Sequence, residues 1–186
     1  MASTYPTSLD AFTNPAATDL LTSPSHAQQH SDINDAMEAL QTKLAIGNTV
    51  IGTYTAYTPT WTNLAVGNGT VVSSYCRVNN LIHYTGGFSF GTTTVVSSTI
   101  AVSLPVTQRV LNASYNMCQG WLEFVDVSAG TLHMGSADYR GNANAVSLEV
   151  GNVGGTYAFN VAVNVSVPFT WATNDKIFWN LTYEAA

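Results

Sequence analysis

The chain has 186 residues, of which 46% are hydrophobic and only 9% are charged, and its formal net charge is −6. This length suits one ordinary domain with a short appendage, and the hydrophobic content excludes a disordered chain. The acidic balance and the scattered basic residues argue against nucleic acid as a partner. A surface of mainly neutral polar side chains is typical of a protein fixed in an assembly or exposed outside cells.

Neither a membrane span nor a secretion signal is expected. No apolar run approaches the ~20 residues that cross a bilayer. The first residues, MASTYPTSLDAF, lack the basic and apolar regions of a signal peptide. We therefore expect synthesis in a cytoplasm and no membrane partner.

Residues 1–22 are predicted to form an extended N-terminal anchoring arm. The segment contains two prolines and many small polar residues, and it shows no steady hydrophobic period. We expect such a segment to be disordered alone and to become ordered when it lies along a partner surface. The large apolar side chains that a partner would cover are Tyr5, Leu9, Phe12, Leu20 and Leu21.

Residues 23–47 are predicted to form an amphipathic oligomerisation helix. Ser23 is a good N-cap, Pro24 suits the first helical position, and Gly47 suits the C-terminal stop. One narrow stripe with the spacing of a heptad seam runs along the helix. We call this stripe the seam; its members are His26, His30, Ile33, Met37, Leu40 and Leu44.

The seam predicts a homotrimer or a homotetramer. With Ile33 and Leu40 at heptad position d, Met37 and Leu44 fall at position a, and Leu at a with Ile at d disfavours dimers. The alternative is a helix that folds back on its own β domain.

His26 and His30 have the His-x-x-x-His spacing of metal ligands. In a parallel trimer they would form two stacked rings able to hold a metal ion, an anion or water. The preferred interpretation is that they form the solvated end of the seam, with no metal and no cofactor.

Residues 48–186 are predicted to form an antiparallel β-sandwich or jelly roll, which makes the chain mainly β. Runs that alternate between apolar and polar residues are separated by turn signals, with no helix among them. The predicted strands are VIGTYTAY, GTVVSSYCRV, NLIHYTGGFSF, STIAVSL, NMCQGWLEFVDV, TLHMGSADYR, AVSLEVG, TYAFNVAVNVSVPF and DKIFWNLTYEA.

No catalytic motif is found, so we expect a protein that is not an enzyme. Glu123 and Asp126 lie three apart on one predicted strand and should face opposite sides, and Asp175 is interpreted as a turn residue. A glycosidase pair drawn from different strands stays open but has no support from spacing. Cys76 and Cys118 are interpreted as two buried thiols rather than a disulfide or metal ligands.

Two further groups of side chains bear on ligand binding. The two histidines of the β region, His83 and His133, are interpreted as ordinary strand residues. Exposed tryptophans could stack on sugars, although aromatic residues on strands more often belong to a core. The four tryptophans are Trp61, Trp121, Trp171 and Trp179.

The segment SPSHAQQHSDINDAMEALQTKLAIG resembles an N-terminal helix common in virion proteins of tailed bacteriophages. There a His-x-x-x-His-x-x-x-Asn-x-Ala-like helix ends in Leu-Gln-x-Lys-Leu-Gly and leads into a β module. The matching residues here are His26, His30, Asn34, Ala36, Leu40, Gln41, Lys43 and Leu44, with Ala45 and Ile46 inserted before Gly47.

Two later pieces, YTPTWTNLAVGNGTVVSSYCRVNNLIHY and VPFTWATNDKIFWNLTYEA, resemble the same family. In the first of them YCRVNN replaces a more usual Tyr-x-Arg-Val-Gly-Asn hairpin. The resemblance covers most of the chain in scattered pieces, and its motifs are structural rather than catalytic.

The resemblance implies a phage structural protein, trimeric, located in the virion and made in the host bacterial cytoplasm. The short chain with one β domain and no fibrous repeat favours a capsid decoration protein that binds the major capsid protein. The alternative is a tail-tip or tail-fibre protein that contacts tail proteins and binds a host surface glycan. An enzyme that degrades surface polysaccharide is a third interpretation, which would need paired buried carboxylates.

Overall fold

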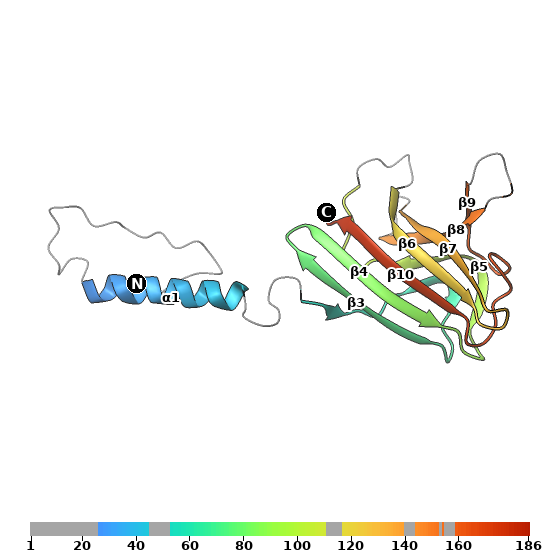
Figure 1. The fold of residues 1–186 in the computed structure, drawn as a ribbon, viewed down its shortest axis with the longest axis horizontal. Helices are drawn as coiled ribbons and strands as arrows, with labels where there is room; N and C mark the ends of the chain where they lie inside the picture. The colour runs from blue at the N-terminus through green and yellow to red at the C-terminus, as the bar shows by residue number, and fades with distance from the viewer. Residues whose placement is uncertain (1–25, 45–52, 111–116, 140–143, 153, 155–158) are drawn as a thin grey trace. The chain divides into compact units, whose positions relative to one another are not determined.

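The computed structural model describes residues 26–44, 53–110, 117–139, 144–152, 154 and 159–186 (Figure 1). The chain divides into two compact units, Met1–Thr53 and Tyr54–Ala186. The first contains the helix α1 and the second contains all of the described strands. The division into an arm (1–22), a helix (23–47) and a β domain (48–186) stays a prediction, since the arm and the linker lie outside the described residues.

The helix α1 spans His26–Leu44. Its sequence contains neither Gly nor Pro and is rich in Ala, Gln and Leu, which favour helix. Gln28 donates from Nε2 to Oδ1 of Asp32 at 2.8 Å, a pair spaced one helical turn apart. The predicted caps at both ends lie outside the described residues.

The second unit is one antiparallel sheet with the strand order β1-β3-β4-β10-β6-β7-β8-β5-β2, and β9 pairs with β8. In Figure 1 the strands β3, β4, β10 and β6 lie side by side in that order. The strands are β1 Thr55–Ala56, β2 Trp61–Ala65, β3 Thr70–Val78, β4 Leu81–Ser89, β5 Val95–Ser103, β6 Met117–Asp126, β7 Thr131–Tyr139, β8 Ala145–Asn152, β9 Phe159–Ala162 and β10 Lys176–Glu184.

The core lies on one side of this sheet, because alternate residues of each long strand point to it. On β10 the buried positions are Ile177, Trp179, Leu181 and Tyr183, every second residue. Other core side chains come from most of the remaining strands: Leu64, Ile82, Tyr84, Phe88, Ile100, Val102, Leu122, Phe124, Ala137, Tyr139, Val146, Leu148 and Val150.

The sheet curls so that β2, the last strand in the order, packs against β4 and β10. Trp61 lies on β2, at one end of the strand order, yet its ring centroid is 5.3 Å from that of Phe88 on β4 and 5.7 Å from that of Trp179 on β10. The structure therefore confirms a mainly β chain with one helix, built on an antiparallel curled sheet. The sandwich or jelly-roll arrangement stays a prediction.

The pair Gly86-Gly87 gives this sheet room for two large rings. A Cβ on Gly86 would lie 2.2 Å from Cζ2 of Trp179, inside the core, and one on Gly87 would lie 2.9 Å from Cδ1 of Phe178 on the other side. Glycine inside a strand often marks such a close approach.

The strand predictions are correct for most of the sheet and wrong at three places. VIGTYTAY contributes only β1 among the described residues, and TYAFNVAVNVSVPF contributes only β9. β2 was not predicted at all. Its alternation is broken by Asn63, whose φ is 58°, at a register shift between Thr62 and Leu64.

Candidate functional site

The described seam residues are exposed on α1, which lies in the first unit. Ile33, Met37 and Leu40 are 55%, 50% and 38% exposed, and His26 and His30 are exposed as well. Such a row of apolar side chains along one helix indicates a surface that another helix would bury. The side chain of Leu44 and the arm residues Tyr5, Leu9, Phe12, Leu20 and Leu21 lie outside the described set.

His26 and His30 point at each other across one helical turn. Their Nε2 atoms are 2.9 Å apart, and their ring centroids are 4.4 Å apart with the ring planes at 73°. The two Nε2 atoms are therefore within hydrogen-bonding distance of each other.

The β unit has an aromatic patch on the side of the sheet away from the core. Trp121 is 45% exposed and Met134 is 53% exposed. The strand register places Trp121 opposite Asn180, and Glu123 between Phe178 and Met134. We call Trp121, Glu123, Met134, Phe178 and Asn180 the outer patch. The outer patch combines a flat apolar ring, on which a sugar ring can stack, with amide and carboxylate groups that can form hydrogen bonds to sugar hydroxyls.

The other tryptophans are packing residues. Trp179 is 2% exposed. The indole of Trp171 stacks on the ring of Phe90 with centroids 4.6 Å apart, and Trp61 packs against the core. The prediction that aromatic residues on strands mostly belong to a core is confirmed for Trp61 and Trp179, and Trp121 is the exception.

A chain of hydrogen-bonded side chains, formed by Tyr54, His83 and Asn180, lies on the same side of the sheet as the outer patch. We call it the polar chain. Tyr54 Oη lies 2.5 Å from Nδ1 of His83, whose Nε2 lies 3.0 Å from Oδ1 of Asn180. An amide oxygen only accepts, so Nε2–H donates to Asn180 and Nδ1 accepts from the Tyr54 hydroxyl. Desolvation of the phenol and the nearby Cys76 thiol raise the pKa of Tyr54. His83 is therefore more than an ordinary strand residue, because it links the residue before β1 to β4 and β10.

Cys76 is a free thiol that is half-buried in this polar chain, not a core residue. The expectation of a buried thiol is wrong for it, because the register places Cys76 directly opposite His83 on the polar side. The Cys118 side chain lies outside the described set.

Three carboxylates of the β unit are buried. Asp175 is fully buried, and its two oxygens accept from the backbone N–H groups of Val127 at 3.0 Å and Ala172 at 2.6 Å. It is therefore more than a turn residue, because it also binds a distant segment.

The other two, Asp138 and Glu149, are 8% and 5% exposed on the neighbouring strands β7 and β8. Ser147 faces Asp138 and Ser136 faces Glu149 in the register, so the two carboxylates are diagonal neighbours. Ser136 donates to Asp138 at 3.2 Å, and both carboxylates have further interactions. This pair is what the polysaccharide-degrading interpretation would require, and sequence spacing could not show it.

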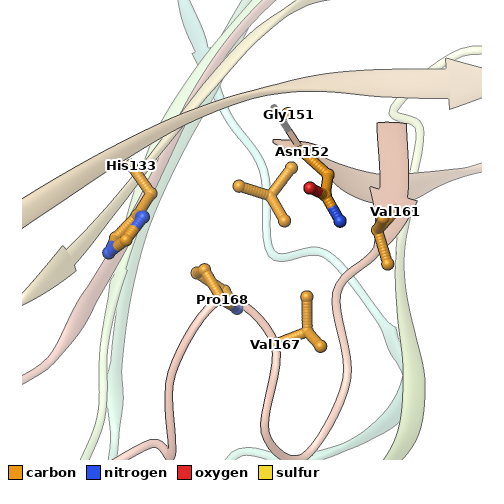
Figure 2. A pocket seen from close by; sticks show the side chains of 7 residues that line it. His133, Gly151, Asn152, Val161, Val167 and Pro168 are labelled. Atoms are coloured by element: carbon orange, nitrogen blue, oxygen red, sulfur yellow. The ribbon is translucent and has the colours of Figure 1, made fainter. Parts of the chain in front are cut away.

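A cavity of about 330 Å³ lies beside β7, β8 and β9, and Figure 2 shows side chains that line it. His133 lies on one side of it and Asn152 on another, and the remaining lining is mainly apolar. The ring of His133 also lies 5.5 Å from that of Phe169. The cavity is lined by neither the outer patch nor the buried pair on β7 and β8. The lining residues are His133, Val150, Gly151, Asn152, Val161, Val167 and Pro168.

Among the described residues, no group of three or more His, Cys, Asp and Glu side chains is arranged to hold a metal ion. In the same part of the chain no helix has the length and hydropathy needed to cross a bilayer. Comparisons with protein-family models, with curated proteins and with solved structures found no match to this chain.

Proposed function

We propose that this chain is a structural protein of a tailed-bacteriophage virion: a trimeric capsid decoration protein bound to the outer capsid surface through its N-terminal region. The observation that carries the proposal is the uncovered row of Ile33, Met37 and Leu40 on α1. Most of the stability of a helix in a protein comes from packing of its apolar face, so we expect partner helices to bury this row. The phage-like helix motif supports the same assignment.

The β unit serves as the exposed body of the proposed assembly. The buried residues of its core cluster lie between Leu64 and Ala185. We take its curled sheet to be a sandwich of the jelly-roll type. A folded body joined to an oligomerisation helix and an arm is all that a decoration protein needs, since many copies on one particle sum weak contacts.

Deleting residues 2–20 is expected to leave a soluble oligomer that no longer adds to particles. The arm supplies the apolar anchor in this proposal, while the seam and the β core remain complete. The measurement is co-sedimentation of intact and shortened protein with undecorated heads and, separately, with tails. Intact protein should coat heads in many copies. Binding only to tails, or equal binding of both forms to heads, would contradict the proposal.

The second candidate is a tail-tip or tail-fibre protein that binds a host glycan through its β unit. The outer patch favours it, because an indole that is 45% exposed beside amide and carboxylate groups suits stacking on a sugar ring.

Replacing Trp121 with Ala should then weaken glycan binding by ten-fold or more, as expected for a loss of about 1.5–3 kcal/mol of stacking and burial. The measurement is binding of the full chain to an array of host surface glycans. Val95→Ala is the matched control, since Val95 is 57% exposed on β5, away from the patch. Failure of the unaltered chain to bind any glycan would remove this candidate and leave the decoration role standing.

A further inference from the structure

The pair His26 and His30 has the geometry of a two-nitrogen chelate. Both side chains lie on one face of α1, both are exposed, and their Nε2 atoms are 2.9 Å apart. A metal–imidazole bond is about 2.0–2.1 Å long, so two nitrogens at right angles around one ion are about 2.9 Å apart. The observed separation therefore equals that of neighbouring ligands in a square-planar or octahedral site.

We propose that His26 and His30 of one chain hold a divalent transition-metal ion between their Nε2 atoms. Square-planar and octahedral preferences are those of Cu²⁺ and Ni²⁺, which also bind nitrogen ligands more tightly than earlier metals of the series. Zn²⁺ prefers tetrahedral angles and would need the nitrogens to move apart. The order of affinity is therefore Cu²⁺ above Ni²⁺ above Zn²⁺, with water completing the coordination.

The close approach of two nitrogens has one other physical explanation, an N–H···N hydrogen bond between neutral rings. Metal binding excludes that hydrogen bond: an ion about 2.0–2.1 Å from both nitrogens lies off the line that joins them, so the donor ring must carry its proton on Nδ1 and both rings must turn toward the ion. Protons compete with metal for these nitrogens, so affinity falls as the pH is lowered.

Two further polar side chains lie near this pair in the sequence of α1. Gln28 and Asp32 form a separate hydrogen-bonded pair on α1. The positive end of the helix dipole opposes a cation near His26 by about 0.3–1 kcal/mol, less than the affinity that a second imidazole adds. Bridging one helical turn at the start of α1 would stabilise the helix that carries the seam.

The inference does not rest on the proposed trimer, because both nitrogens come from one chain. It departs from the preferred sequence interpretation, in which the two histidines only form a solvated end. Spacing alone could not show that the two Nε2 atoms approach each other as closely as neighbouring ligands of one ion do.

The test is calorimetric titration of the tag-free full chain with Ni²⁺, together with far-UV circular dichroism. Saturable binding with a gain in helix signal is expected, and His30→Gln should weaken binding by about ten-fold or more. Cu²⁺ added to the unaltered chain should show two coordinating nitrogens by electron paramagnetic resonance.

Two controls keep the test specific. The double variant His30→Gln, Ser31→His retains all four histidines but turns the second ring off the shared face, so it should bind as weakly as His30→Gln. His83→Gln and His133→Gln should bind Ni²⁺ like the unaltered chain. Equal binding by the unaltered chain and His30→Gln, or full binding by the double variant, would overturn the inference.

Discussion

Replacing both Ile33 and Leu40 with Asp is expected to convert the proposed trimer into monomers whose β unit still folds. In the proposed trimer these side chains occupy the axis, where six carboxylates would lose their water and repel one another. Removing an unpaired charge from water costs several kcal/mol, so the dissociation constant should rise by at least about a thousand-fold. Light scattering measures the assembly, and circular dichroism measures the strands.

The matched control places the same charges on the opposite side of the helix. Ser31 and Thr42 fall at heptad positions b and f, so Ser31→Asp with Thr42→Asp should remain trimeric. A monomeric unaltered chain at micromolar concentration would refute the trimer. Loss of the strands in the Ile33, Leu40 variant would show that α1 belongs to the β core.

The main strands could be predicted because their alternation is a local property. On β4 and β10 every second side chain is buried apart from the glycine at position 86, so the sequence pattern carries the two faces of the sheet directly. β2 carries no such pattern: within its five residues only Leu64 is buried, and Asn63 interrupts the strand. Its place is determined by rings that Trp61 meets on distant strands, which no local window contains.

The candidate sites also differ in whether a local sequence pattern can predict them. The seam is a periodic feature of one helix, and the structure places its described members on one exposed face. The outer patch depends on the strand order β10-β6-β7, which brings Asn180 beside Trp121 across a long stretch of chain. Sequence reasoning named Trp121 only as one of four tryptophans, because register and exposure were needed to separate it from the three that pack inside.

Asp175 shows how a correct local interpretation misses a role in stability. Asn174, with φ 74°, and Asp175 lie at a turn as predicted. However, the partner Val127 lies 48 positions earlier, at the start of the β6–β7 turn. The backbone oxygen of Asp175 also accepts from the N–H of Phe90 at 2.9 Å. Three segments therefore meet at this one residue.

Asp175→Ala is expected to lower the free energy of unfolding of the β unit by about 2–4 kcal/mol. The change leaves the N–H groups of Val127 and Ala172 without the acceptor that each has in the fold, at about 1–3 kcal/mol for each unsatisfied buried group. Both groups lie near the surface, where water replaces part of the loss, so the lower half of the summed range is expected. Against a typical total of 5–15 kcal/mol this is a large fraction.

Urea unfolding followed by tryptophan fluorescence measures the effect, and Asp126→Ala is the matched control. Asp126 also accepts two hydrogen bonds in a turn, from the N–H of Ala129 at 2.9 Å and the hydroxyl of Ser128 at 2.7 Å. These donors are exposed and return to water when the carboxylate is removed, so the midpoint should move little. Asp175→Asn should fall between the two, because its amide keeps one acceptor but turns a donor toward the second N–H. Equal midpoints for Asp175→Ala and Asp126→Ala would show that Asp175 acts only as a local turn residue.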